Sequence, residues 1–203
     1  MMNGPGTGEA ITGISSMATR GVLAELIPEY ERLSGRAVIV ESVGGVAAAR
    51  RVQEGEPFDI VVLAADALDR LAEAGRIDAE GRVDVARSGV AVAVAAGAPR
   101  SDIGSEAAVR DAILAARSIG YSTGPSGVHL SRLFERWGIA GTIAPRIVQA
   151  PPGVPVGTLV ARGEVELGFQ QSSELMHVSG IEVLGPLPPE IQIVTVFSAA
   201  PCM

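Results

Sequence analysis

The sequence predicts an α/β protein of two lobes, each a mainly parallel sheet flanked by helices. Strand-like apolar runs alternate with amphipathic helical segments along most of the 203 residues, which is the pattern of successive βα units with right-handed crossovers. Hydrophobic residues make up 47% of the chain and aromatic residues 3%, so the core must be built from Ala, Val, Ile and Leu. No short repeat period is present, which argues against a solenoid.

The first part of the chain reads as three βα units, and Gly35 and Gly55 each follow a helix where a C-terminal glycine is favoured. In the first helix, Leu23, Leu26, Ile27 and Tyr30 have the spacing of one buried face, and Leu68 and Leu71 predict a buried face for the third. The expected strands are 10–14, 37–40 and 59–64, and the expected helices are 17–33, 46–54 and 65–74.

The remainder of the chain continues the alternation. Leu130, Leu133, Phe134 and Trp137 predict one buried helix face, and the proline-rich stretches 150–155 and 185–189 read as turns. The expected strands are 90–96, 118–121, 143–149, 166–169 and 191–198, and the expected helices are 105–116, 125–137 and 156–162.

Composition excludes several classes of function. The net charge of −7, with no dense run of basic residues, argues against a nucleic-acid partner but not against a small anion, which backbone donors bind locally. Cys202 is the only cysteine, so no internal disulfide is possible. His129 and His177 are the only histidines, and no Cys/His cluster has metal-ligand spacing, so we expect no metal and no cofactor.

The compartment is left open by the sequence. No apolar run reaches the roughly 18 residues that suggest a membrane span. The N-terminal stretch MMNGPGTGEA lacks the basic and apolar regions of a signal peptide. A periplasmic location is expected if a signal peptide has been removed, and a cytoplasmic one otherwise.

Three strand-to-helix loops enter their helices through small or hydroxyl residues. They are Ile14-Ser15-Ser16-Met17, Ser42-Val43-Gly44-Gly45 and Ser122-Thr123-Gly124-Pro125-Ser126-Gly127. The first N–H groups of a helix have no internal partner and lie at the positive end of its dipole, so they suit an anion. In open α/β sheets such loops gather at the carboxyl ends of the strands. The same residues are also ordinary helix caps, so binding and capping both remain open.

Residues that could carry catalysis are few. No nucleophile elbow G-x-S-x-G and no Walker A spacing occurs. Gln170 and Gln171 follow a buried strand, where they could either contact a ligand or form a solvated turn. Glu41 and Glu174 could supply carboxylates, but nothing in their spacing requires it. An enzyme is therefore less favoured than a binding protein.

Three motifs together resemble a family: EGEPFDIVVLAAD at 54–66, YSTGPSGV at 121–128 and LVARGEVELGF at 159–169. They are similar to the corresponding segments of periplasmic molybdate-binding proteins, the type II substrate-binding components of ABC transporters. The resemblance runs from about residue 11 to 198. It implies two lobes joined by two hinge strands, with a small anionic ligand in the cleft and an ABC transporter permease as a possible partner. Lobe 1 would comprise 1–84 plus 190–203, and lobe 2 would comprise 85–189.

The resemblance also implies site residues. Ser15 and Ser16 match the family's first serine loop, and Ser126 matches a backbone N–H donor in the loop that continues through Gly127 and Val128. Arg20 could pair with a carboxylate. Gly44 and Gly45 stand where the family has serines, and Gln170 and Gln171 stand near its tyrosine. Two side-chain oxyanion donors are thereby lost, which favours a larger ligand than molybdate, such as an organic acid.

Two alternatives remain beside an anion-binding protein. The fold also resembles that of organic-acid isomerases, in which case Glu41 or Glu174 could act as the base. A cytoplasmic small-molecule sensor domain is the other. Family members usually continue past the return strand into helices that cover lobe 1, so apolar surface exposed at the shortened C-terminus favours either self-association or a truncated chain.

Overall fold

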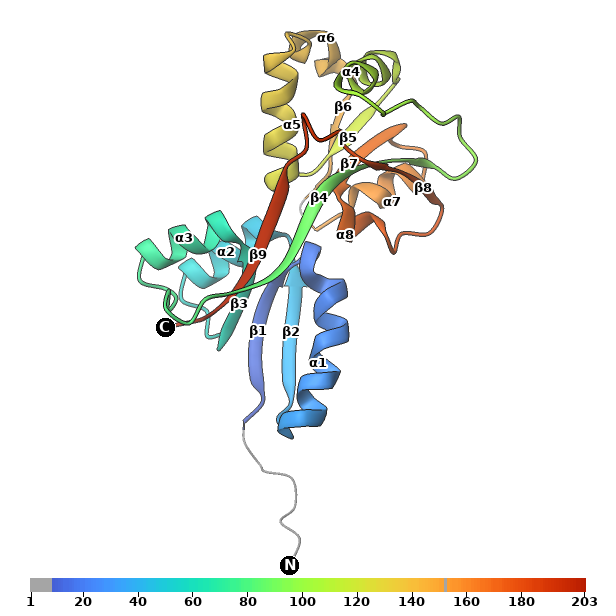
Figure 1. Ribbon diagram of the computed structural model, residues 1–203. Coiled ribbons are helices and arrows are strands. Elements are labelled where there is room, and N and C mark those ends of the chain that lie inside the picture. The colour runs from blue at the N-terminus through green and yellow to red at the C-terminus, as the bar shows by residue number, and fades with distance from the viewer. Residues whose placement is uncertain (1–8, 152) are drawn as a thin grey trace, which may run out of the picture. The chain divides into compact units, whose positions relative to one another are not determined.

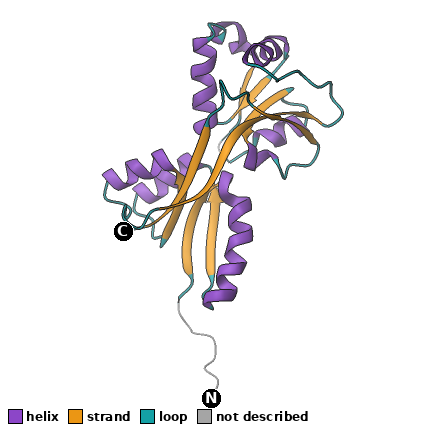
Figure 2. Cartoon of the chain, viewed as in Figure 1, coloured by secondary structure: helices purple, strands orange, loops and turns teal. Residues whose placement is uncertain are grey.

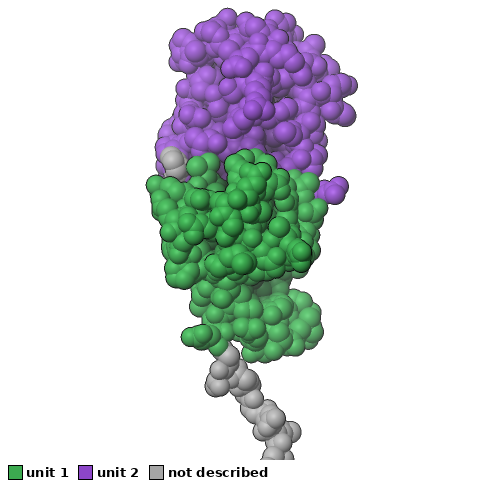
Figure 3. Space-filling model, turned by 90° about the vertical axis from the view of Figure 1, so that its left-hand side faces the viewer, with its two compact units in different colours: residues 1–86, 196–203 green, residues 87–195 purple. Residues whose placement is uncertain are grey.

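The computed structural model describes residues 9–151 and 153–203, and the chain divides into two compact units (Figure 3). Within the described residues, unit 1 contains 9–86 and 196–203, and unit 2 contains 87–195. The chain passes between the units twice, within β4 (Val83–Ala95) and within β9 (Val194–Pro201). The predicted α/β class is confirmed, since each unit is a sheet flanked by helices (Figure 2).

Unit 1 is a sheet in the order β2-β1-β3-β9 with three helices (Figure 1). Strand β1 pairs in parallel with β2 and β3, and β9 is antiparallel to β3. The elements, besides the ends of β4 and β9, are β1 (Ile11–Ser16), a 3-10 turn (Met17–Thr19), α1 (Arg20–Ser34), β2 (Val38–Val43), α2 (Gly45–Gln53), β3 (Ile60–Ala64) and α3 (Ala65–Glu73).

The core of unit 1 lies between the sheet and helices α2 and α3. Leu68 and Leu71 are buried there with Ile14 and Val61, as predicted. The predicted buried face of α1 is wrong, because α1 has no buried residue and Leu26 remains 50% exposed. Helix α1 packs mainly against the short 3-10 turn and β2, which is the edge strand of the sheet. Self-association through exposed apolar side chains stays a prediction.

Unit 2 is a mixed sheet in the order β4-β7-β5-β6, with β8 also paired to β4. Strand β5 is parallel to both β6 and β7, whereas β4 is antiparallel to β7 and β8. The further elements are α4 (Glu106–Ala115), β5 (Ile119–Tyr121), α5 (Pro125–Arg136), α6 (Ala140–Ile143), a 3-10 turn (Ala144–Arg146), β6 (Ile147–Gln149), α7 (Val156–Ala161), β7 (Leu167–Gln171), α8 (Ser172–Leu175) and β8 (Ile181–Pro186).

The two faces of the unit 2 sheet are packed differently. Leu130, Leu133 and Phe134 of α5 are buried against one face, as predicted, while Trp137 is partly buried. On the other face, α7 approaches so closely that a Cβ on Gly168 would lie 2.5 Å from the side chain of Val160. Glycine in β7 therefore sets the distance at which α7 packs.

Several predicted boundaries are wrong. Residues 143–146 are helical, and β8 includes Gly185 and Pro186, which were expected in a turn. β8 pairs only with β4 in the described chain, so Pro186, which has no N–H group, removes no hydrogen bond to a second neighbouring strand. Ser15 and Ser16 end β1, and Gln170 and Gln171 end β7, so these four residues lie in strands and not in loops.

Candidate functional site

Two of the three candidate loops belong to unit 1. They lie side by side at the carboxyl ends of β1 and β2, where Ser16 is in register with Val43. The hydroxyl of Ser16 accepts a hydrogen bond from the N–H of Ala18 at 3.3 Å. A Cβ on Gly45 would lie 3.5 Å from the same hydroxyl oxygen. The structure therefore brings together Ser16 and Gly45, as expected for strand ends in a parallel sheet.

The Ser15 side chain at this edge is already bonded. Ser15 is fully buried and its hydroxyl lies 2.8 Å from that of Ser42. Gly44 is the N-cap residue of α2, and because glycine has no side chain it accepts no hydrogen bond from the first N–H groups of that helix. Arg20, the first residue of α1, is exposed and makes no ion pair within the described part of the chain. The groups left for a ligand in unit 1 are thus backbone N–H groups, Arg20 and the O–H of Ser16, whose oxygen only accepts from Ala18.

The third loop begins α5 in unit 2. Gly124 caps the helix without a side chain, and Pro125 occupies its first turn, as the sequence predicts. Ser126 is buried, with its hydroxyl 3.4 Å from that of Ser122. A Cβ on Gly127 would lie 1.6 Å from the carbonyl oxygen of Ser122. Glycine is therefore required here to pack the loop against its own helix, whether or not a ligand approaches.

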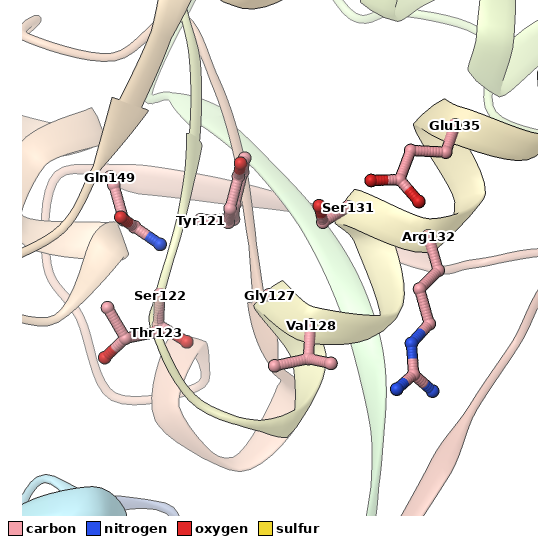
Figure 4. A pocket seen from close by; sticks show the side chains of 9 residues that line it. All are labelled: Tyr121, Ser122, Thr123, Gly127, Val128, Ser131, Arg132, Glu135 and Gln149. Atoms are coloured by element: carbon pink, nitrogen blue, oxygen red, sulfur yellow. The ribbon is translucent and has the colours of Figure 1, made fainter. Parts of the chain in front are cut away.

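A pocket of about 390 Å³ opens beside this helix start. Figure 4 shows hydroxyl, amide and guanidinium groups around it, with Arg132 and Glu135 one turn or more along α5. Arg132 is exposed and has no ion-pair partner among the residues described. The lining residues are Tyr121, Ser122, Thr123, Gly127, Val128, Ser131, Arg132, Glu135 and Gln149. Sequence reasoning missed Arg132 and Gln149, since neither lies in a motif.

Gln170 and Gln171 lie at the same edge of the unit 2 sheet as the loop that begins α5, because β5 and β7 are parallel and Tyr121 is in register with Phe169. Both are 2% exposed. The Gln170 side chain accepts from the N–H of Val156 at 2.8 Å and donates to Glu174 at 2.6 Å. The Gln171 side chain donates to Thr195 at 2.8 Å. Its Oε1 atom is buried with no hydrogen-bond partner in the described structure.

The two carboxylates considered as bases differ sharply. Glu41 is exposed and forms an ion pair with Arg51 at 2.9 Å. Glu174 is largely buried, and this burial raises its pKa to about 7, although the hydrogen bond from Gln170 lowers the pKa in part. A carboxyl group that titrates near neutral pH can both accept and donate a proton, so Glu174 is the better candidate.

Metal binding has no support in this part of the molecule. Nowhere in residues 9–151 and 153–203 do three or more His, Cys, Asp or Glu side chains gather to hold an ion. His129 instead donates through Nε2 to the carbonyl of Ile191 at 2.9 Å. None of the helices in the same ranges has the length and apolar character that a membrane crossing requires.

The sequence matches a known protein family. Residues 11–203 match the family described as bacterial extracellular solute-binding protein. An aconitate isomerase of Pseudomonas sp is 37% identical over 196 residues, which cover 94% of this chain and 74% of the relative.

Solved structures show the fold. The periplasmic molybdate-binding protein of Azotobacter vinelandii has a TM-score of 0.76 at 19% identity, over 95% of this chain and 85% of its own. The tungstate ABC transporter protein of Geobacter sulfurreducens has a TM-score of 0.74 at 15% identity, over 96% and 85%. The fold is that of type II periplasmic binding proteins, and the chain belongs to the bacterial extracellular solute-binding protein family.

Proposed function

We propose that this protein binds a small organic anion that carries carboxylate groups. The observation that carries the proposal is the pocket at the start of α5, whose lining includes Ser122, Thr123, Gly127 of the first helical turn and Arg132. A guanidinium matches a carboxylate with two parallel hydrogen bonds. The sequence contains no lysine, so recognition by lysine is not available.

An organic acid fits these residues better than a tetrahedral oxyanion. An oxyanion is bound by many short donors, yet the Ser15 hydroxyl is buried and paired with that of Ser42. Gly44 and Gly45 have no side-chain donors, so Ser16, whose hydroxyl accepts from Ala18, is the remaining side chain with an O–H to donate. The aconitate isomerase relative points to a tricarboxylate as the first ligand to test. Within unit 1 taken by itself, the proposed contacts are Arg20 and the backbone of Ser15, Ser16, Gly44 and Gly45. Within unit 2 taken by itself, the proposed contacts are Arg132, Gln171 and the backbone N–H groups of Ser126 and Gly127. The N–H of Val128 donates to the Gly124 carbonyl at 3.1 Å, so Val128 contributes only to the pocket lining.

The work of a solute-binding protein would include delivery to a permease, and an ABC transporter permease is the proposed partner. This follows from the family and from the molybdate and tungstate proteins that share the fold. Co-purification of a membrane permease with the tagged protein, lost when ligand is removed, would support delivery.

The binding proposal is tested by isothermal titration calorimetry with cis-aconitate, trans-aconitate, citrate and molybdate. We expect binding of at least one tricarboxylate and none of molybdate. Arg132→Gln should weaken that binding about 10-fold or more, because it removes a charge-assisted hydrogen bond. Arg162→Gln is the matched control, since Arg162 is an exposed arginine paired with Glu164 outside the pocket. Equal affinities in wild type and Arg132→Gln would refute the pocket assignment.

A second candidate function is isomerisation of an unsaturated organic acid. The buried Glu174 carboxyl favours it, together with the 37% identity to an aconitate isomerase. The test is conversion of cis-aconitate to trans-aconitate, followed by NMR in D₂O. Deuterium entering the product carbon would show proton transfer with solvent exchange. Tight binding of both isomers without conversion would leave a binding protein.

A further inference from the structure

The side chain of Gln170 is held at both ends, and this fixes which way its amide faces. Val156 and Gly157 begin α7 with N–H groups 2.8 and 3.4 Å from Gln170 Oε1. Backbone N–H groups can only donate, so the atom facing them must be the carbonyl oxygen. A flipped amide would put its NH₂ group against two other donors in a site that is 2% exposed. The NH₂ group therefore faces Glu174.

This orientation distinguishes the two oxygens of Glu174. Gln170 Nε2 lies 2.6 Å from Glu174 Oε2 and is a donor only. Oε2 must then accept a hydrogen bond whether the carboxyl group is ionised or neutral. When Glu174 takes up a proton, the proton is consequently held on Oε1.

We propose that Glu174 Oε1 is the acid–base atom of an allylic proton transfer in this protein, and that Gln170 is the positioning residue that keeps the proton on that oxygen. The inference rests on the second candidate function above. The substrate class is an unsaturated polycarboxylate with a C–H group that is allylic to the double bond and adjacent to a carboxylate.

The transfer balances without any other reactant. Oε1 takes the proton from the allylic carbon, and the electron pair of the broken C–H bond moves into the conjugated carboxylate system. The double bond shifts by one position, and Oε1 returns the proton to the far carbon of the allylic unit. A new C–H bond forms there, and Glu174 ends ionised as it began.

The surroundings of Glu174 suit both halves of this cycle. Burial raises the pKa of Glu174 to about 7, the Gln170 hydrogen bond opposes this rise, and no charged neighbour contributes. Charged groups on the adjoining elements are paired or exposed. Glu182 of β8 forms an ion pair with Arg100, and Arg162 after α7 forms one with Glu164. His177 after α8 and Arg87 of β4 are exposed. Next to it, Ser173 Oγ is buried with no partner in the described chain.

The positioning role is tested first without turnover. The carboxyl carbon of Glu174 is titrated by ¹³C NMR in the ligand-free protein and assigned by its loss in Glu174→Gln. We expect a midpoint near 7 in wild type and a higher midpoint in Gln170→Met, which lacks the stabilising donor. Gln171→Met is the matched control, because Gln171 is equally buried in the same strand but donates to Thr195. The same midpoint in Gln170→Met as in wild type, or an equal shift in both variants, overturns the positioning role.

The catalytic role is tested by kinetics on full-length protein. Glu174→Gln should lower kcat for aconitate by about 10²-fold or more while calorimetry still shows binding. It is close to Glu in volume and keeps an acceptor for Gln170, so it should fold. The acid limb of kcat/KM should move to higher pH in Gln170→Met. Conversion by wild type that survives in Glu174→Gln overturns this inference alone, whereas no conversion by wild type overturns the isomerase function itself.

Discussion

The hydroxyl oxygens of Ser15 and Ser42 lie 2.8 Å apart across the parallel strands β1 and β2. Ser15 is fully buried, so its hydroxyl bonds to a neighbouring strand and not to solvent. This pair stabilises the edge of the unit 1 sheet at which Ser16 and Gly45 meet. The serine that the family resemblance assigns to ligand binding thus has a structural bond of its own.

We predict that Ser15→Ala lowers the free energy of unfolding by about 1 kcal/mol, the usual net value of a buried hydrogen bond. The affinity for the tricarboxylate should stay within about 2-fold of wild type, because the proposed contact at Ser15 is the backbone. Urea denaturation and calorimetry measure the two quantities, and Ser42→Ala should behave alike. A large loss of affinity at unchanged stability would instead assign the hydroxyl to the ligand.

Two glycines, one among the proposed contacts of each unit, should respond in opposite ways to the same substitution. Gly127→Ala places its Cβ 1.6 Å from the Ser122 carbonyl, so it should displace the start of α5 and lower the melting temperature. Gly45→Ala meets only ordinary contact at 3.5 Å from Ser16 and lies at the first position of α2, where alanine is tolerated. It should fold normally while its methyl group hinders an anion at the helix start. Circular dichroism melting separates the two outcomes, and a stable, normally melting Gly127→Ala would contradict the packing argument.

Ligand binding itself should appear as a thermal shift. At about 100 times its dissociation constant, a ligand adds roughly 2.7 kcal/mol to stability. For a chain of this size that corresponds to an increase in Tm of several degrees. We expect the shift with citrate or an aconitate and not with molybdate, tungstate, sulfate or phosphate. A shift with molybdate or tungstate alone would make the protein an oxyanion receptor.

The alternation of strands and helices could be predicted from the sequence because periodicity is a local signal. Leu68 and Leu71 were assigned correctly for this reason, since their helix packs on a central part of the sheet. Leu26 and Tyr30 have the same spacing but remain exposed, because α1 packs beside an edge strand. Periodicity shows that a face is apolar, and it does not show whether a partner covers it. Gly185 and Pro186 predict a turn, whereas the structure places them in β8, which forms by pairing with β4.

The site was predictable only in part, for a related reason. The helix starts at Gly44 and Gly124 follow from glycine and hydroxyl residues that are adjacent in sequence. The bonds of Gln170 do not, because Val156 lies 14 residues before it on a separate helix. The same holds for the burial that raises the pKa of Glu174. Such properties depend on which elements the fold brings together.

The raised pKa of Glu174 makes a prediction about stability as well as chemistry. Its pKa is about 7 in the folded protein and 4.5 in the unfolded chain. Between these values the folded state binds more protons, so this group lowers stability as the pH rises from 4.5 to 7. Above pH 7 the cost is about 3 kcal/mol. Glu174→Gln removes it, and scanning calorimetry should show a Tm higher by several degrees at pH 8 and little change at pH 4.5.

Glu166→Gln is the control of opposite sign. Glu166 accepts from the backbone N–H of Arg117 at 2.6 Å, and this bond lowers the pKa of its carboxyl group. Its contribution to stability is therefore present above the unfolded pKa and lost as the pH falls through the lower folded value. Replacing Glu166 should lower the Tm at pH 8, where replacing Glu174 raises it. If Glu174→Gln lowers the Tm at pH 8 as Glu166→Gln does, or if it gives the same shift at pH 4.5 as at pH 8, the carboxyl group of Glu174 does not titrate near neutral pH.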